Sequence, residues 1–157
     1  MNLIVILGAE YLFIAIGIIA FIYWLRLTSK QKLKVAVFGI ITIIIAFLLA
    51  KLGGAIFYNA RPFVTDHVTS LFPHIADNGF PSDHTLFSAV IAVTICSVSK
   101  KLGLLLGGLA IIVGISRVLA NIHHPIDIIG SLVFAMISGL IAYYLTPKII
   151  KLIKTKS

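Results

Sequence analysis

The sequence predicts an all-α membrane protein, a compact bundle of about five transmembrane helices that forms a single domain over residues 1–157. Two observations support this fold class. First, 60% of the residues are hydrophobic and only 11% are charged, with a mean hydropathy of +1.12, whereas a soluble domain carries about 25% charged residues. Second, five apolar runs come close to the roughly 20 residues that a spanning helix needs.

The apolar runs place the expected helices in chain order. No positive charge precedes the first run, and the run is too long for the apolar region of a signal peptide, so we expect it to be retained. Pro81 is expected in the first turn of the third helix and Pro125 at the start of the fifth, because the first turn leaves N–H groups unpaired anyway. The five runs are Leu3–Leu25, Leu33–Tyr58, Ser82–Ser99, Leu102–Ala120 and Ile126–Leu145.

The basic residues predict the orientation of these helices. Ten of the 13 Lys and Arg residues fall in three clusters, within residues 26–34, 100–101 and 148–156. Five helices put all three clusters on one side, which the positive-inside rule assigns to the cytoplasm, with the N-terminus outside and the C-terminus inside. The net charge of +8 is then explained by orientation and attraction to anionic membrane lipids. We therefore expect a multi-pass plasma-membrane protein with no nucleic-acid partner.

The opposite side collects almost all other ionisable residues. Ionisable groups that lie at or in a membrane, despite the free-energy cost of removing them from water, indicate a functional site. Glu10 lies within the first run, and the rest map to the outer side or just below it: Lys51, Arg61 and Arg117, the histidines His67, His74, His84, His123 and His124, and the acids Asp66, Asp77, Asp83 and Asp127.

Three short segments carry most of this polar set: ARPFV around Arg61, PSDH from Pro81 to His84, and SRVLANIHHPID from Ser116 to Asp127. Together they resemble the three-part signature of the type 2 phosphatidic acid phosphatase superfamily, KxxxxxxRP, PSGH and SRxxxxxHxxxD. Within that superfamily, RPFV, PHIAD and PSDHT are most similar to the bacitracin-resistance type of undecaprenyl diphosphate phosphatase. The third part of the signature matches in full, at Ser116, Arg117, His123 and Asp127.

Two positions depart from the signature. Asp83 replaces a glycine. Its carboxylate is either a first-turn acid favoured by the helix dipole, or a charge that raises the pKa of His84 and keeps that ring protonated. Gly54 holds the position of the family's first lysine, while the nearest lysine, Lys51, lies three residues earlier. Lys51 and Glu10 are predicted at a similar depth in the membrane, so an ion pair between them is the favoured role of Lys51. Direct phosphate binding by Lys51 is the alternative.

The residue types suit phosphoryl transfer, which requires positive charge around the phosphate oxygens, a nucleophile and a proton for the leaving group. Arg61 and Arg117 are candidates for bidentate phosphate binding. The backbone N–H groups of Ser82 and its neighbours, at the start of a helix, are expected to point at an anion. The expected substrate-binding set comprises Arg61, Arg117, Ser82, Pro81, Asp83, Ser116 and Lys51.

The resemblance implies the catalytic roles. His123 would attack phosphorus to form a phosphohistidine, and His84 would protonate the leaving lipid oxygen and later activate water. Asp127 would accept a hydrogen bond from the other ring nitrogen of His123 and fix its tautomer. The scheme needs no metal ion or other cofactor, and no HxxxH or HxH spacing marks a pair of metal ligands.

The sequence thus predicts a lipid phosphatase at the outer membrane surface that acts on a lipid diphosphate, with undecaprenyl diphosphate as the favoured substrate. A phosphatase for phosphatidic acid or phosphatidylglycerophosphate would use the same catalytic residues and stays open as an alternative. A non-enzymatic lipid-binding or small transport protein would not need the pairing of His123 with Asp127.

Overall fold

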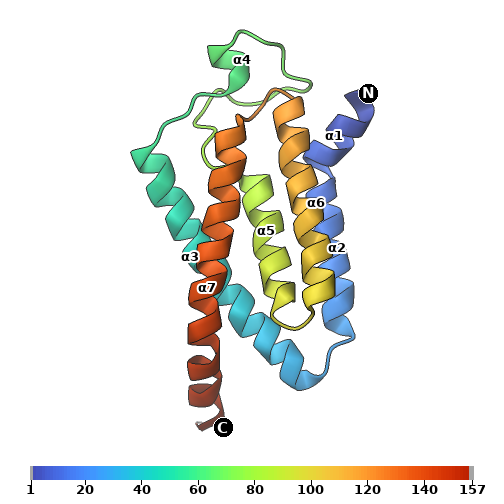
Figure 1. Ribbon diagram of the computed structural model, residues 1–157, viewed down its shortest axis with the longest axis vertical. Helices are drawn as coiled ribbons and strands as arrows, with labels where there is room; N and C mark the ends of the chain where they lie inside the picture. Colours follow the sequence, from blue (N-terminus) through green and yellow to red (C-terminus); the bar gives the residue numbers. More distant parts are fainter. Residues whose placement is uncertain (1, 156–157) are drawn as a thin grey trace.

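The protein is a bundle of helices, described over residues 2–155 by a computed structural model (Figure 1). Within these residues the structure has no named strand, only an isolated bridge between Ala60 and Asn78. The helices are α1 (Asn2–Glu10), α2 (Leu12–Leu25), α3 (Ser29–Ile56), α4 (Pro62–Thr65), α5 (Asp83–Cys96), α6 (Lys100–Leu119) and α7 (Pro125–Thr155).

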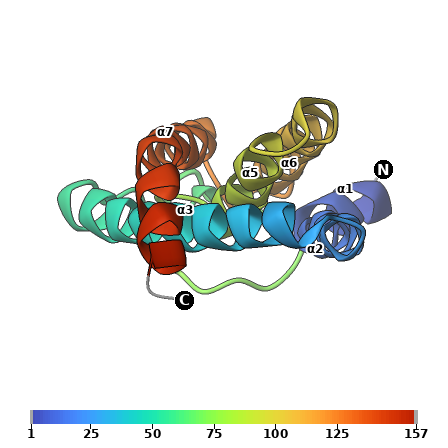
Figure 2. The same ribbon diagram turned by 90° about the horizontal axis from the view of Figure 1, so that it is seen from below.

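Helix α5 is the centre of the bundle. One apolar core joins it to α2 and α6 through residues such as Ile16, Ala92 and Leu106. A second joins it to α3, α6 and α7, where Ala46, Ala89, Ala110 and Ala135 allow the helix backbones to approach closely. Seen from below, α3 runs obliquely across the other helices (Figure 2), and it packs mainly on α7 and α5.

The outward faces of the helices are apolar, as expected for contact with lipid. Large side chains such as Ile40, Leu48, Ile111 and Met136 are exposed. Hydroxyl groups lie inside and are satisfied within their own helices, where each donates to the carbonyl four residues earlier. These are Thr42, Ser88, Thr94, Ser131, Ser138 and Thr146. This arrangement suits a medium that offers no hydrogen bonds to a polar group.

Local signals explain several helix starts. Thr28 and Gln31 form a capping box at the start of α3, and the Ser99 side chain accepts from the backbone N–H of Leu102 at the start of α6. Pro125 begins α7, as the sequence predicts. Pro81 does not lie in the first turn of α5, so that prediction is wrong: Ser82 is the N-cap and α5 begins at Asp83.

The expected set of five spans is confirmed only in part. In the described chain, α3, α6 and α7 are long and apolar enough to cross a membrane. The first run is not one helix, because α1 and α2 meet at Tyr11 with a bend of 48° and count as a fourth span only if taken together. Helix α5 has only 14 residues, or about 21 Å at 1.5 Å per residue, which is shorter than the roughly 30 Å of a bilayer's hydrocarbon core.

The polar loops and the basic clusters lie at opposite ends of the bundle. The long connection from α3 to α5, which includes α4, and the turn from α6 to α7 are at the upper end in Figure 1. The α2–α3 turn, the α5–α6 turn and the end of α7, which carry the lysine clusters, are at the lower end. The structure therefore brings the three clusters together, while the membrane side that each end faces stays a prediction.

Candidate active site

The predicted catalytic residues and the two arginines meet at the loop end of the bundle, although they come from three separate segments of the chain. His123 lies in the turn between α6 and α7, and Asp127 in the first turn of α7. Arg117 lies in the last turn of α6, and Arg61 directly precedes α4. His84 lies in the first turn of α5. Helix ends thus place each of these side chains near the same point.

His123 and Asp127 form the expected pair. The Nδ1 atom of His123 donates to Asp127 Oδ2 at 3.2 Å, and the two side chains are 2% and 0% exposed. The carboxylate also accepts from Asn59 Nδ2 at 2.7 Å and from the backbone N–H of His124 at 2.9 Å. Because Nδ1 carries the proton, the lone pair of His123 is on Nε2, the atom that faces the site.

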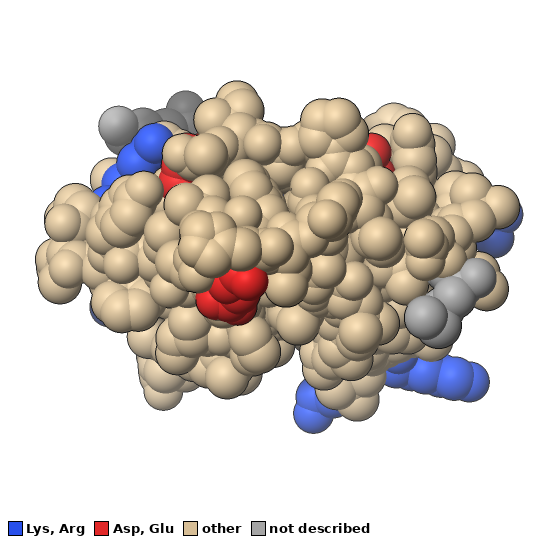
Figure 3. Space-filling view, turned by 90° about the horizontal axis from the view of Figure 1, so that it is seen from above, with Lys and Arg blue, Asp and Glu red and all other residues tan. Residues whose placement is uncertain are grey.

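Two arginines converge on this Nε2 atom. Arg61 Nη1 lies 3.2 Å from it and Arg117 Nη2 lies 3.4 Å from it. Both arginines are almost fully buried. Seen from the loop end, the surface is mostly uncharged, with acidic groups on it and Lys and Arg toward its margins (Figure 3). The site therefore presents two guanidinium groups and one unprotonated ring nitrogen to the same small volume.

Each arginine is held by further contacts. Arg61 Nε donates to Asp77 Oδ1 at 2.7 Å, and its Nη1 donates to the carbonyl of Ile122 at 2.8 Å. Burial alone would raise the pKa of Asp77, but the hydrogen bond and charge of Arg61 outweigh it and hold that pKa below its usual value. The carboxylate is thus ionised and keeps the guanidinium plane of Arg61 fixed.

Arg117 contacts the loop and the N-terminal helix. Its Nη1 donates to the carbonyl of Ala9 at 3.2 Å, and its Nη2 donates to His74 Nε2 at 3.3 Å. His74 Nδ1 in turn donates to the carbonyl of Ile75. The Nε atom of Arg117 is buried and has no hydrogen-bond partner among the described residues, which is uncommon for a charged donor.

The site environment keeps His123 neutral. Burial of the ring lowers the pKa of His123, and the charges of Arg117 and Arg61 lower it further. The hydrogen bond that His123 donates to Asp127 acts in the opposite direction, but the pKa stays below its ordinary value. The pKa of His74 is also lowered, first by burial and then by Arg61. An unprotonated imidazole can act as a nucleophile, so the geometry and the protonation state agree.

His84 lies where the polar site meets an apolar groove. Its ring packs edge-on against Phe13, with centroids 4.5 Å apart, and it is close enough to Arg117 to interact with the charge of the guanidinium group. A groove of about 330 Å³ begins at His84 and runs between α2, α3 and α5, past Ile43 and Phe87. A second groove of about 350 Å³ shares Ile43, Phe87 and Val90 and continues toward Trp24. An apolar path therefore leads from His84 along the membrane-facing side of α5.

The remaining predicted binding residues lie near the site without contacting its centre. The backbone N–H of Ser82 is not free for an anion, because it donates to the carbonyl of Asp127 at 3.3 Å, and the Ser82 hydroxyl pairs with that of Thr85. The first free amides of α5 are those that follow it. Asp83 is exposed in the first turn, and Ser116 is buried against α1. The direct roles of Pro81, Ser82, Asp83 and Ser116 stay predictions.

The expected ion pair between Lys51 and Glu10 is wrong. Lys51 is exposed on α3, and its Nζ atom lies over the Phe47 ring, 5.4 Å from the centroid. Glu10 instead acts electrostatically on Arg117, across the contact between α1 and α6. Similar depth in the membrane does not bring two side chains together when their helices turn them toward different neighbours, as happens for Lys51 and Glu10.

Sequence reasoning also missed residues that support the site. Asn59 holds Asp127, Asp77 holds Arg61, and His74 contacts Arg117. Gly79 is required because a Cβ there would lie 2.9 Å from Asp127 Oδ2 and 3.1 Å from the Asn59 carbonyl. The PHIAD stretch contained a signal for His74 and Asp77, but no spacing in the sequence connects Asn59 with Asp127.

No group of three or more His, Cys, Asp or Glu in residues 2–155 is arranged to hold a metal ion. The positive charge at the site comes from the two guanidinium groups.

Comparisons with known proteins agree with this geometry. The sequence profile of the PAP2 superfamily matches residues 35–151. The chain is 36% identical over 152 residues to a Bacillus licheniformis protein named bacitracin transport permease protein BcrC, covering 95% of this chain and 73% of that one. It is 33% identical over 137 residues to undecaprenyl-diphosphatase BcrC of Bacillus subtilis (strain 168), covering 85% and 69%.

A solved structure shares the fold. The crystal structure of Aquifex aeolicus LpxE superposes with a TM-score of 0.66 at 24% sequence identity, covering 89% of this chain and 81% of that one. The profile match and the two relatives confirm the resemblance expected from the three motifs.

Proposed function

The chain belongs to the PAP2 superfamily and is a lipid diphosphate phosphatase, and from this premise we propose that it converts undecaprenyl diphosphate to undecaprenyl phosphate and inorganic phosphate at the outer face of the plasma membrane. One observation carries the mechanism: His123 Nε2 faces both Arg61 and Arg117, while Asp127 holds the proton on Nδ1. The substrate assignment follows the undecaprenyl-diphosphatases among the relatives.

In the proposed first step, the terminal phosphoryl group lies between the two guanidinium groups and the ring of His123. The Nε2 lone pair attacks phosphorus, the bond to the bridging oxygen breaks, and the lipid phosphate leaves with that electron pair and a proton from His84. The arginine N–H groups stabilise the charge on the equatorial oxygens. The unpaired Arg117 Nε supports this placement, because a phosphate oxygen would accept its hydrogen bond.

In the second step, water attacks the phosphohistidine while His84 accepts its proton. The N–P bond breaks, inorganic phosphate leaves, and the lone pair returns to His123 Nε2. Asp127 stabilises the positive charge that the ring carries in the intermediate. This sequence of steps is balanced without a metal ion.

The two adjoining apolar grooves, the first of which begins at His84, support the assignment of a long-chain substrate. The prenyl chain would leave the site past Phe13, Ile43 and Phe87 and remain in contact with the bilayer. The leaving oxygen would then lie near His84, where a proton is needed.

The test is phosphate release by the purified protein from undecaprenyl diphosphate, phosphatidic acid and phosphatidylglycerophosphate at equal concentrations, with and without EDTA. We expect the diphosphate to have the highest kcat/KM and EDTA to change it less than twofold. Faster release from phosphatidic acid would reject the substrate assignment, and loss of activity in EDTA that Mg²⁺ restores would reject the metal-independent mechanism.

A further inference from the structure

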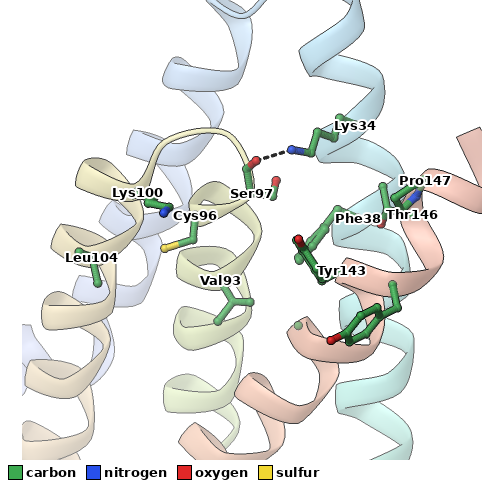
Figure 4. Close-up of a pocket in the computed structure, with 12 residues that line it drawn as sticks. Lys34, Phe38, Val93, Cys96, Ser97, Lys100, Leu104, Tyr143, Thr146 and Pro147 are labelled. Atoms are coloured by element: carbon green, nitrogen blue, oxygen red, sulfur yellow. Dashed lines mark hydrogen bonds between the residues drawn. The ribbon is translucent and has the colours of Figure 1, made fainter.

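A third groove, separate from the two near His84, lies at the end of the bundle opposite the active site. It has a volume of about 750 Å³, within the range of ligand pockets, and is bounded by α3, α5, α6 and α7. Phe38, Val93, Leu104 and Tyr143 line it, and two lysines, Lys34 and Lys100, lie on either side of Ser97 (Figure 4). None of these residues belongs to the catalytic site.

The short length of α5 creates this groove. Helix α5 ends at Cys96 after 14 residues, so the α5–α6 turn lies higher in the bundle than the adjacent ends of α3 and α7 (Figure 1). The two longer helices extend past the turn and form side walls. Lys100, at the start of α6, therefore lines the groove together with apolar side chains while its own side chain stays exposed.

The groove is strongly positive and has no acidic counterpart. A neighbouring cavity shares Lys34, Thr146 and Pro147 with it and adds Lys151 and Lys154. All five acidic residues of the chain belong to elements of the other end: Glu10 ends α1, Asp66 and Asp77 lie in the connection from α3 to α5, and Asp83 and Asp127 lie in the first turns of α5 and α7. The charges at the groove are therefore not neutralised by a carboxylate of this chain.

Polar donors are present at the same place. Lys34 Nζ donates to the carbonyl of Ser97 at 2.6 Å, which places its ammonium group at the mouth of the groove. The hydroxyl of Ser97 is buried and has no hydrogen-bond partner among the described residues. A ligand with several acceptor oxygens would satisfy both the hydroxyl and the remaining N–H groups of the lysines.

We propose that this groove binds one anionic phospholipid, such as phosphatidylglycerol, with its phosphodiester between Lys34 and Lys100 and one acyl chain along Phe38, Val93 and Leu104. The apolar wall matches an acyl chain, and the unneutralised lysines match a phosphate. A zwitterionic phospholipid fits less well, because its ammonium group would be repelled by the lysine cluster.

Native mass spectrometry of the purified full-length protein in detergent tests this site. Phosphatidylglycerol and phosphatidylcholine with identical acyl chains are titrated separately, and apparent dissociation constants are taken from the bound fractions. We expect one phosphatidylglycerol to bind more tightly than phosphatidylcholine. The double variant Lys34→Gln with Lys100→Gln should bind phosphatidylglycerol about 30-fold more weakly, as expected for two lysines near an anionic headgroup.

Matched variants separate the groove from general charge attraction. Lys30→Gln with Lys101→Gln removes the same charge from two exposed lysines that do not line the groove, and it should change the affinity less than twofold. Leu104→Trp should weaken binding with both lysines intact, whereas Ile115→Trp, about three turns along the same face of α6, should not. Equal losses in the two double variants, or equal affinity for both lipids, would overturn the proposal.

Folding and catalysis provide independent readouts. Lys34→Gln removes the hydrogen bond to Ser97, so Lys100→Gln alone is measured as well, with thermal unfolding of every variant. Phosphate release from a lipid diphosphate in detergent should stay within twofold of the parent in the lysine variants and in Leu104→Trp, because the catalytic residues lie at the other end. A failure of the groove proposal is thus distinguishable from a failure of the proposed function.

Discussion

The backbone carbonyl of Ala9 accepts a hydrogen bond from Arg117 Nη1 at 3.2 Å, across the contact between α1 and α6. The bend at Tyr11 explains why this carbonyl is available. In an uninterrupted helix, Ala9 would accept from the N–H four residues later, but the chain turns by 48° between α1 and α2 and that bond is not formed. A segment outside the matched PAP2 region, which begins at residue 35, thus helps to hold Arg117, which we propose binds phosphate.

Gly8 should be required for this contact. A Cβ at Gly8 would collide with the side chain of Ser116, the residue before Arg117. We expect Gly8→Val to lower kcat/KM about 10- to 100-fold by displacing the arginine, with a larger effect on kcat than on the amount of folded protein. Gly17→Val is the control, since the nearest atom to a Cβ there is Ile91 Cδ1 at 4.0 Å. Equal effects of the two variants would show that α1 does not position the site.

His123→Ala should abolish phosphate release while leaving the protein folded, because binding groups cannot replace a missing nucleophile. Substrate labelled in its terminal phosphate should leave label on the parent protein after rapid acid-free quenching, and none on the variant. His124→Ala is a matched control: its backbone N–H still supports Asp127, and within residues 2–155 the hydrogen-bond partner of its ring is Thr65 Oγ1, at 3.5 Å. Turnover by His123→Ala within a few-fold of the parent would reject the mechanism.

Asp127→Asn should change both the rate and its dependence on pH. The hydrogen bond that His123 donates to Asp127 raises the pKa of His123, whereas burial and the two arginines lower it and keep it below the ordinary value of 6.5. On the acid side, activity of the parent should therefore fall only at a pH below 6.5, where His123 becomes protonated. The variant should have kcat lower by about 100-fold or more, and its acid limb should move to lower pH. Movement of the limb to higher pH would contradict the assignment.

Asn59 should tolerate a neutral substitution better than an acidic one. Asn59→Ala leaves one oxygen of the buried Asp127 without its 2.7 Å donor, which should lower kcat about tenfold. Asn59→Asp adds a second carboxylate at the same place, and repulsion should raise the pKa of the pair and reduce kcat further. Similar rates for the two variants, measured with equally folded protein, would show that Asn59 does not act through Asp127.

The loop end should be accessible from outside the cell. Single cysteines at Ile75, which is 75% exposed, and at Thr155, in a Cys96→Ser background, provide one probe at each end. On intact cells, an impermeant thiol reagent should label Ile75→Cys and not Thr155→Cys, and detergent should make both reactive. The reverse pattern would overturn the orientation inferred from the lysine clusters.

Several properties follow from the sequence because they depend on local composition. Apolar run length predicts helices, and Thr28, Ser99 and Pro125 give their starts. The spacing from His123 to Asp127 is short, so the helix start at Pro125 is enough to bring the two side chains together. The gathering of three lysine clusters at one end needs only the alternating direction of successive helices.

Other properties depend on the tertiary structure because they depend on which face each helix turns toward its neighbours. Lys51 turns to the exposed side of α3, while Glu10 turns toward Arg117. Asn59 reaches Asp127 across 68 residues of sequence. The helix bend that frees the Ala9 carbonyl occurs at Tyr11, which is neither glycine nor proline. Composition and spacing determined that this chain forms membrane helices with phosphatase motifs. Packing determined which groups support those motifs, since rotation about a helix axis and loop contacts are fixed only when distant segments meet.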